Sequence, residues 1–286
     1  MIFTIVFITG LLIGSFLNVV ILRFNTGESI ITGVSRCLNC SKKLKWDELI
    51  PVLSFLTQKG RCRKCGAKIS LQYPLVEIIT GFMFLLVFIK IYGGLQSGFS
   101  SLILNNNFIA PLFFIFPSAD SFSKRVQSVL LNPILFFGAV SFFSSLIVIS
   151  VYDIYHKIIP DAFSYFIAAI SFVYAFVASA LFFGRGFFIQ AILSGAALVF
   201  VFFAMAFLSR EKWMGYGDVK LVFSLGLFLG PAGAFFAFLF SFWIGAIFGI
   251  IVLFLSKKFS LKSQIPFAPF LALGAFLSFL LNFNFY

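Results

Sequence analysis

A series of long apolar runs constrains the fold more than any other feature of the sequence. Hydrophobic residues make up 61% of the 286 residues and charged residues only 10%, for a mean hydropathy of +1.10. A helix of about 20 apolar residues crosses the hydrocarbon core of a bilayer. The runs therefore predict an all-α, polytopic membrane protein of about eight transmembrane helices, over residues 2–22, 74–92, 131–152, 162–183, 187–208, 219–230, 232–255 and 266–284.

Three local features refine this prediction. The run at 2–22 has neither a basic start nor a small-residue cleavage site after it, so we expect a retained first helix and not a signal peptide. The sequence LGP at Leu229–Pro231 predicts a turn between the sixth and seventh spans. Phe108–Phe116 is apolar too, but prolines bracket it and it is too short to cross, which predicts a re-entrant or surface segment.

The basic residues predict the orientation in the membrane. If the N-terminus lies on the outer side, the inner loops are 23–73, 153–161, 209–220 and 256–265, and together they contain seventeen of the 21 Lys and Arg residues. Such an excess on one side is the positive-inside pattern. We therefore expect both termini on the outer side. The net charge of +12 then reflects orientation in lipid, and we expect no nucleic-acid partner.

Charge and hydropathy divide the chain into four parts. These are the first transmembrane helix (1–22), a polar cytoplasmic loop (23–73), the second transmembrane helix with an outer loop (74–130), and a six-helix domain (131–286). The cytoplasmic loop has about fifty residues, a size at which small domains often need a metal or a disulfide for stability.

All four cysteines lie in that loop, in two Cys-x2-Cys pairs. The pairs are CLNC, with Cys37 and Cys40, and CRKC, with Cys62 and Cys65. Their spacing resembles that of structural zinc sites, in which four thiolates complete a tetrahedral shell. The alternative is two disulfides, which a reducing cytoplasm disfavours. We predict a small, zinc-stapled loop domain, in which Gly66 suits the tight turn after the second pair.

Two carboxylates are the candidate catalytic pair. Asp153 ends the third span and Asp218, preceded by Gly215 and Gly217, opens the sixth. Two spans separate them, so both lie on the cytoplasmic side. Neighbouring carboxylates in a partly desolvated place share a proton, which allows one to act as acid while the other polarises water. Two structural alternatives stay open. Asp153 could form an ion pair with Lys157, four residues on, and Asp218 could cap its helix.

The remaining ionisable groups have simpler interpretations. Glu77 lies within the second span, where an unpaired charge is costly, so we expect it to pair with the basic loop or to serve a site. Asp161 follows Pro160 at the start of a span, which predicts a cap. His156, the only histidine, is interpreted as an interfacial residue. We expect solvated surface positions for the other acids, which are Glu28, Asp47, Glu48, Asp120 and Glu211. For Glu211, an ion pair with Lys212 is the alternative.

Taken in order along the chain, these motifs resemble the type IV prepilin peptidases, which are leader peptidases and N-methyltransferases. The resemblance covers nearly the whole chain, and several motifs in the same order make it specific. It rests on GSFLNVVILR (Gly14–Arg23), the cysteine segment (Ser35–Gly81), DIYHKIIPD (Asp153–Asp161), MGYGDVKL (Met214–Leu221) and IPFAPFLALG (Ile265–Gly274).

The resemblance implies a bacterial inner-membrane aspartic peptidase with Asp153 and Asp218 as its catalytic pair. It implies that prepilins or pseudopilins of a pilus or secretion system are the substrates, with their basic leaders cleaved on the cytoplasmic side and both termini of the enzyme in the periplasm. It also implies N-methylation of the new N-terminal residue by S-adenosylmethionine. The four cysteines match the tetrad of the methyltransferase-associated loop, and Glu77 is the candidate for binding the methyl donor. Rival readings are a peptidase without methyltransferase activity and a transporter whose acids bind an ion.

Overall fold

The computed structural model of the protein describes residues 1–92, 119–180, 185–211, 214–255 and 265–281, and these residues form helices without a named strand. Six of their helices are long and apolar enough to cross a membrane by length and composition. The helices, in chain order, are α1 (Ile2–Arg23), η1 (Trp46–Glu48), α2 (Leu53–Thr57), α3 (Gln72–Tyr92), α5 (Ala119–His156), α6 (Asp161–Ala178), α7 (Arg185–Ser209), α8 (Tyr216–Leu255) and α9 (Ala268–Leu281).

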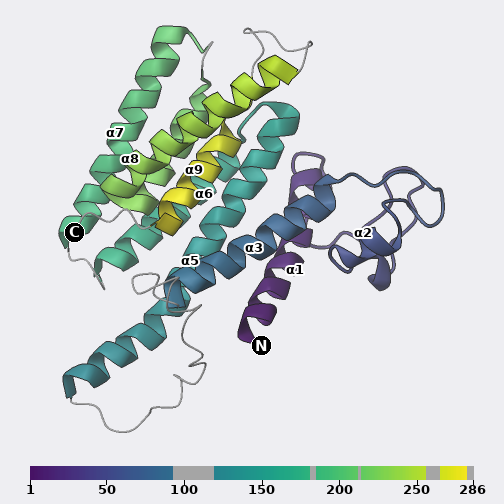
Figure 1. Cartoon of the computed structure of the whole chain (residues 1–286), viewed down its shortest axis with the longest axis horizontal. Helices are drawn as coiled ribbons and strands as arrows, with labels where there is room; N and C mark the ends of the chain where they lie inside the picture. The colour runs from purple at the N-terminus through teal and green to yellow at the C-terminus, as the bar shows by residue number, and fades with distance from the viewer. Residues whose placement is uncertain (93–118, 181–184, 212–213, 256–264, 282–286) are drawn as a thin grey trace.

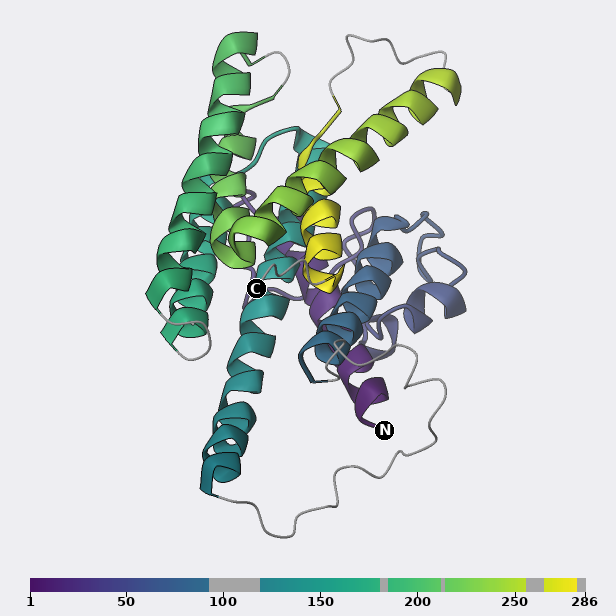
Figure 2. The ribbon, with the colours of Figure 1, turned by 60° about the vertical axis from the view of Figure 1, so that its left-hand side comes forward.

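Helix α8 contains the predicted turn. Its backbone leaves the helical region at Gly230, where φ is +69°, and Pro231 follows. Glycine reaches a positive φ without steric cost, and proline cannot continue the hydrogen-bond ladder of the preceding turn. The chain bends back at this point, so that the two halves of α8 form a hairpin (Figure 2). The sixth and seventh predicted spans are therefore the two arms of α8, and the turn at Leu229–Pro231 is confirmed.

The helices pack as two groups joined through α5. Helices α1 and α3 lie side by side, while α8 packs on α6, α7 and α9 (Figure 1). Helix α5 contacts both groups, since it touches α1 and α3 on one side and α6 and α9 on the other. Its Phe142 stacks face to face on Phe228 of α8, with ring centroids 3.9 Å apart. This contact helps to fix α5 against α8, the two helices that carry Asp153 and Asp218.

Glycine residues, which have no side chain, allow α1 to approach α3 closely. A Cβ atom at Gly10 would lie 2.8 Å from the Cα of Gly81, and one at Gly14 would lie 2.7 Å from the Cα of Glu77. Small residues spaced by one turn are the usual means by which membrane helices pack backbone to backbone. The pair α1–α3 is therefore a rigid unit, and it is the one that carries the cysteine loop.

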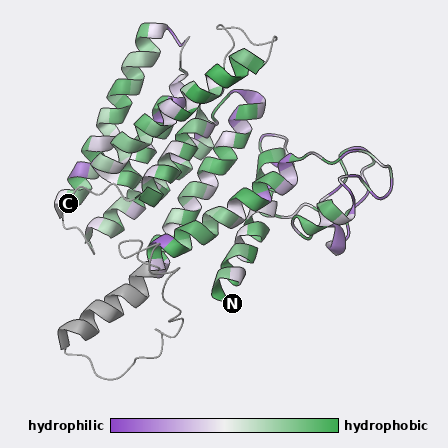
Figure 3. Ribbon diagram, viewed as in Figure 1, coloured by the Kyte–Doolittle hydropathy of each residue, from purple (hydrophilic) through white to green (hydrophobic). Residues whose placement is uncertain are grey.

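The polar loop between α1 and α3 stands apart from the membrane helices. Hydrophilic residues gather there and at helix ends, whereas the long helices are apolar along their length (Figure 3). The loop contains only η1, α2 and two isolated bridges, Arg36 with Lys43 and Arg61 with Lys68. The predictions for Phe108–Phe116 and for the partner Lys212 lie outside the described residues, as does the side chain of Asp120.

A glycine pair holds α7 against the first arm of α8, and it generates a prediction. A Cβ at Gly226 would lie 2.4 Å from the Cα of Gly195. We expect Gly226→Ala to separate these helices and to cost about 1–3 kcal/mol of stability, as overpacked cores do. Thermal unfolding in detergent measures the loss.

The matched control is Gly245→Ala in the second arm of α8, where the nearest atom is an ordinary contact at 3.5 Å. Alanine has the higher helix propensity, so this variant is expected to be as stable as the wild type or slightly more so. Equal melting temperatures for the two variants would contradict the proposed close approach.

Candidate functional site

Asp153 lies in the last turn of α5 and is buried, with 6% of its surface exposed. Its Oδ2 accepts a hydrogen bond of 3.2 Å from the backbone N–H of Ala268, the first residue of α9. Ser150 donates to the carbonyl of the same residue at 3.4 Å. The first N–H groups of a helix have no partner within it, and a helix N-terminus favours a negative charge. The start of α9 is therefore built against the Asp153 carboxylate.

Asp218 lies in the first turn of α8 and is equally buried, with 8% exposed. Its backbone N–H donates to the carbonyl of Gly215 at 3.2 Å, and its carboxylate lies close enough to Asp153 to interact with it electrostatically. Among the described residues, its Oδ1 has no hydrogen-bond partner. A buried, unpaired carboxylate oxygen is costly, so it marks a place where another polar group is expected to bind.

The structure bears differently on the simpler roles expected for Asp153, Asp218 and Asp161. Lys157 is exposed, and its backbone N–H, not its side chain, bonds to the carbonyl of Asp153. For the capping alternative, the Gly215 backbone lies within reach of the Asp218 carboxylate just before its helix, while Oδ1 has no hydrogen-bond partner among the described residues. The expected cap at Asp161 is wrong: Pro160 is the N-cap residue, and Asp161 forms an ion pair of 2.6 Å with Lys220 of α8. This pair links the start of α6 to the start of α8 at the exposed surface, where an ion pair contributes little to stability.

The two glycines before Asp218 have different surroundings. A Cβ at Gly217 would lie 3.0 Å from the Cβ of Ile159, so this glycine packs against the α5–α6 connection. At Gly215 a Cβ would meet nothing closer than 3.9 Å, and the residue is exposed. Open space therefore lies beside the carboxylate pair. His156 is exposed and stacks on Tyr152, with ring centroids 4.1 Å apart.

The four cysteines converge in the cytoplasmic loop. All are free thiols, and their sulfur atoms lie within 4.8 Å of one another, with 3.9 Å between the Sγ atoms of Cys37 and Cys65. Zinc–sulfur bonds of about 2.3 Å give a tetrahedron with edges of about 3.8 Å. A disulfide would instead bring two sulfurs to about 2.05 Å. The cluster therefore fits one tetrahedral metal ion.

The two cysteine pairs adopt the same turn. The amide of Cys37 bonds to the carbonyl of Lys42, and that of Cys62 to the carbonyl of Ala67. The residue after each second cysteine has a positive φ, 53° at Ser41 and 70° at Gly66. Backbone amides point at the sulfurs in such turns. The Ala67 amide, together with the Asn39 side chain, lowers the pKa of the Cys65 thiol to about 6, which favours the thiolate that a metal needs.

Helix η1 joins the two cysteine turns, and here one expectation fails. Glu48 is buried, with 5% exposed, and not a solvated surface residue. It accepts hydrogen bonds from the Lys42 side chain at 2.8 Å and from the Lys45 backbone at 3.0 Å, while Asp47 pairs with Arg63. The hydrogen bond from Lys42 lowers the pKa of Glu48, so the acid stays ionised despite its burial. The spacing of residues in the sequence does not show this arrangement, because the ion-pair partners, Lys42 and Arg63, come from the two cysteine turns.

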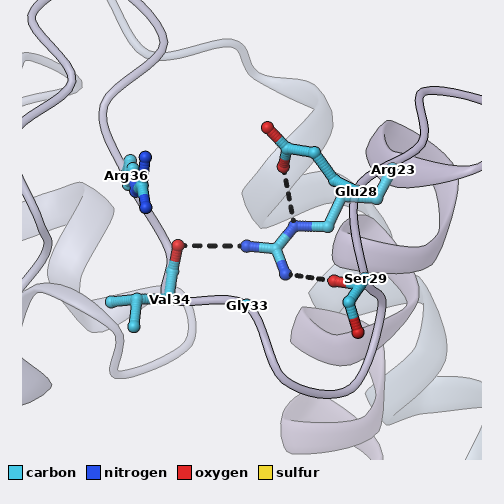
Figure 4. Close-up of a pocket in the computed structure, with 6 residues that line it drawn as sticks. All are labelled: Arg23, Glu28, Ser29, Gly33, Val34 and Arg36. Atoms are coloured by element: carbon cyan, nitrogen blue, oxygen red, sulfur yellow. Dashed lines mark hydrogen bonds and ion pairs between the residues drawn. The ribbon is translucent and has the colours of Figure 1, made fainter.

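Arg23, at the end of α1, organises the segment that leads into the first cysteine turn. Its guanidinium donates to the carbonyls of Ser29 (2.7 Å) and Val34 (3.1 Å) and pairs with Glu28 at 3.4 Å (Figure 4). These residues line a pocket of about 200 Å³ together with Gly33 and Arg36. A side chain at Gly33 would collide with the guanidinium. Arg23 is thus occupied in holding the loop.

Glu77 is buried in α3, with 6% exposed, and its Oε2 accepts a hydrogen bond of 2.8 Å from the backbone N–H of Val52. The expected pairing with a basic side chain is absent among the described residues. Asn18 of α1 donates to the carbonyl of Tyr73, which lies one turn before Glu77 in α3. A polar seam therefore runs between α1 and α3 where they meet the cytoplasmic loop.

This fold and these sites define an integral membrane protein with a buried aspartate pair and a separate four-cysteine cluster. The Bacterial Peptidase A24 N-terminal domain matches residues 8–91, and the Type IV leader peptidase family matches residues 140–250. The protein named prepilin leader peptidase/N-methyltransferase from Bacillus subtilis is 32% identical over 97% of this chain and 93% of its own length. The protein of that name from Aeromonas salmonicida is 28% identical over 97% and 90%.

The chain belongs to the type IV leader peptidase family. A shorter region of 78 residues is 53% identical to the Myxococcus xanthus protein of the same name. No solved structure matches the chain. With six long apolar helices among its described residues, the protein is a multi-pass protein of the inner membrane.

Two features of the sites are not apparent from the sequence. Ala268 acts through its backbone N–H, so its side chain carries no signal, although it lies within the quoted motif IPFAPFLALG. Val52 is an apolar residue in a loop, and only its backbone conformation sets it apart. Hydrogen bonds from main-chain groups are the part of a site that residue types predict least.

The metal site generates a prediction. We expect Cys62→Ser to lose the bound zinc, because a hydroxyl is a poor substitute for one of four thiolates. Zinc content of the purified protein measures this. The control is Ser41→Gly, which suits the positive φ at that position and is expected to keep its zinc. Metal-free wild-type protein with two disulfides would contradict the metal centre.

Proposed function

We propose that the protein removes leader peptides from type IV prepilins or pseudopilins, with Asp153 and Asp218 as the catalytic pair. The observation that carries this is the buried pair itself, in which the Oδ1 of Asp218 has no partner among the described residues. Family membership gives the reaction class, that of an aspartic peptidase, and the relatives' names give the substrate. Intramembrane acids of this kind are retained for function.

The two aspartates have different surroundings, and these assign their roles. Asp153, which accepts the Ala268 amide, is the carboxylate that takes a proton from the attacking water. The water oxygen then bonds to the scissile carbonyl carbon, while protonated Asp218 donates a hydrogen bond to the carbonyl oxygen. Collapse of this intermediate breaks the C–N bond, and the proton passes to the leaving nitrogen. The open space at Gly215 gives the substrate backbone room beside the pair.

The proposed orientation follows the basic residues. The loop that carries the cysteines and the connection that carries Gly215 face the cytoplasm, and both termini face the periplasm. The basic leader is then cleaved on the cytoplasmic side, just before the apolar helix of the substrate, which remains in the lipid. We propose four parts of the chain, 1–22, 23–73, 74–130 and 131–286, with 23–73 as the methyltransferase-associated loop and 131–286 as the peptidase domain.

The second proposed activity is methylation of the new N-terminal residue. S-adenosylmethionine supplies an electrophilic methyl group when bound, and the freed amine is the nucleophile. Cys37, Cys40, Cys62 and Cys65 would hold a zinc ion, and with all four positions filled by protein the metal is structural. Glu77, at the junction of this loop and the membrane, belongs to the methyl-transfer half.

The peptidase assignment is tested by removing each carboxylate. Asp153→Ala and Asp218→Ala are each expected to lower cleavage of a co-expressed prepilin by about 100-fold or more, as losing a general acid or base does. Intact mass of the pilin reports cleavage, and immunoblotting reports accumulation of the enzyme. Asp161→Ala is the matched control, since this acid is exposed and pairs only at the surface, and it should cleave normally. Normal cleavage by either active-site variant would refute the pair.

The role of the α9 N-terminus is tested by deleting one N–H group. Proline is tolerated at the first helical position, so Ala268→Pro removes the donor to Asp153. Because Ala268 is fully buried, thermal unfolding of the variant is measured alongside cleavage to show that it is folded. A hydrogen bond to a charged group is worth about 1.5–3 kcal/mol, and about 1.4 kcal/mol is tenfold in rate. We expect cleavage to slow by roughly 10- to 100-fold. Ala268→Ser keeps the N–H and should cleave at close to the wild-type rate. Equal rates for both variants would exclude this role.

A further inference from the structure

The connection between η1 and α2 contains a strained backbone turn. Val52 has φ +61° and ψ −50°, and the N–H of Leu53 bonds to the carbonyl of Pro51 at 2.6 Å. A hydrogen bond between residues two apart, around a residue with positive φ, is a γ-turn of the rare, strained kind. A β-branched residue is an outlier in this region. Such a conformation persists only where the surrounding structure enforces it.

The group that enforces this turn comes from the membrane. The N–H of Val52 donates to the Oε2 of Glu77 at 2.8 Å, and Glu77 is a buried residue near the start of α3. The Glu77 side chain also has a hydrogen-bonding neighbour in Ser15 of α1. Among the described residues it has no cationic partner, so its bond to a backbone amide is the main directional contact of this carboxylate.

The packing of α1 on α3 makes this contact possible. Gly14 lies against the backbone of Glu77, where a Cβ would approach the Glu77 Cα to 2.7 Å. The polar seam continues through Asn18, which donates to the carbonyl of Tyr73 and accepts from the Gln72 side chain. The carboxylate is thus held on a rigid helix pair, and not on a mobile surface.

The strained turn lies between the membrane and the cysteine cluster. It follows η1, whose acids bind side chains of both cysteine turns, and it precedes α2. Helix η1 also contacts α2, so the segments on the two sides of the strained turn pack against each other. The bond from Glu77 to Val52 therefore fixes the α3 side of the cysteine loop, as the Arg23 hydrogen bonds fix its α1 side.

We propose that Glu77 is a positioning residue for methyl transfer, which acts by pinning the Val52 turn and so docks the cysteine loop on the membrane helix pair. The inference rests on the proposed methyltransferase activity. Glu77, Val52 and all four cysteines fall within the N-terminal family domain at 8–91, whereas both aspartates fall within the peptidase region at 140–250. Loss of the pin is thus expected to affect methylation and to leave cleavage intact.

The experiment compares variants of the full-length protein co-expressed with a prepilin, with cleavage and methylation both read from the intact mass of the pilin. Glu77→Ala removes the acceptor and is expected to lower methylation at least tenfold. Glu77→Gln keeps an oxygen that can accept the Val52 N–H, and methylation should stay within about threefold of the wild type. Thr80→Val is the matched control, because the Thr80 hydroxyl is buried in the same helix but bonds only to Val76 of its own turn.

Relief of the strain gives a second, independent arm. Glycine adopts a positive φ readily, so Val52→Gly no longer requires a pin. Added to Glu77→Ala, it is expected to restore methylation several-fold. If Glu77→Gln loses methylation as completely as Glu77→Ala, or if Val52→Gly restores nothing, the positioning role is overturned, and the first result would assign Glu77 to direct contact with the methyl donor or amine. A wild-type enzyme that cleaves without methylating would instead refute the proposed methyltransferase activity.

Discussion

The structure depends on the cost of burying two carboxylates at one place in a membrane protein. Neither Asp153 nor Asp218 has a cationic partner among the described residues, so the compensation comes from backbone amides at helix starts. The start of α9 faces Asp153, and the start of α8 lies at Asp218. Because the carboxylates sit on different helices, this compensation depends on how α5, α8 and α9 pack together.

That requirement explains much of the packing around the pair. Aromatic stacking of Phe142 on Phe228 and the glycine contact of Gly226 with Gly195 set the position of the first arm of α8. The bend at Gly230 then returns the chain, so that the second arm can pack on α9. The helices form a scaffold in which the acids are placed by backbone geometry, and in which the substrate's peptide bond is expected to meet them at the exposed Gly215.

The N-terminal part solves a different problem, since a loop of about fifty residues has little core of its own. Its four cysteines supply one staple, and the ion pairs of Asp47 and Glu48 connect the two cysteine turns. The loop is joined to the membrane through Arg23 on one side and Glu77 on the other. The two structural units meet mainly at α5, with a further contact between α3 and α9, and we propose that each unit serves one of the two activities.

The sequence predicts the helices, the turn at Leu229–Pro231 and the approach of the cysteine pairs, because hydropathy and Cys-x2-Cys spacing are local signals. It misjudges Glu48 and Asp161, whose ion pairs depend on residues brought close only by folding. It also does not predict the hydrogen bond from the Ala268 amide or the γ-turn at Val52, because neither depends on the chemistry of a side chain. Tertiary contacts of backbone groups are therefore what the structure adds.

The central claim is that one chain cleaves a prepilin and then methylates the new N-terminus. The most direct test incubates the purified wild-type protein in detergent with a prepilin and S-adenosylmethionine, and follows the intact mass of the pilin with time. We expect loss of the leader, followed by the gain of one methyl group on the shortened chain and not on the precursor. A pilin that keeps its leader in the presence of folded, zinc-loaded protein would contradict it.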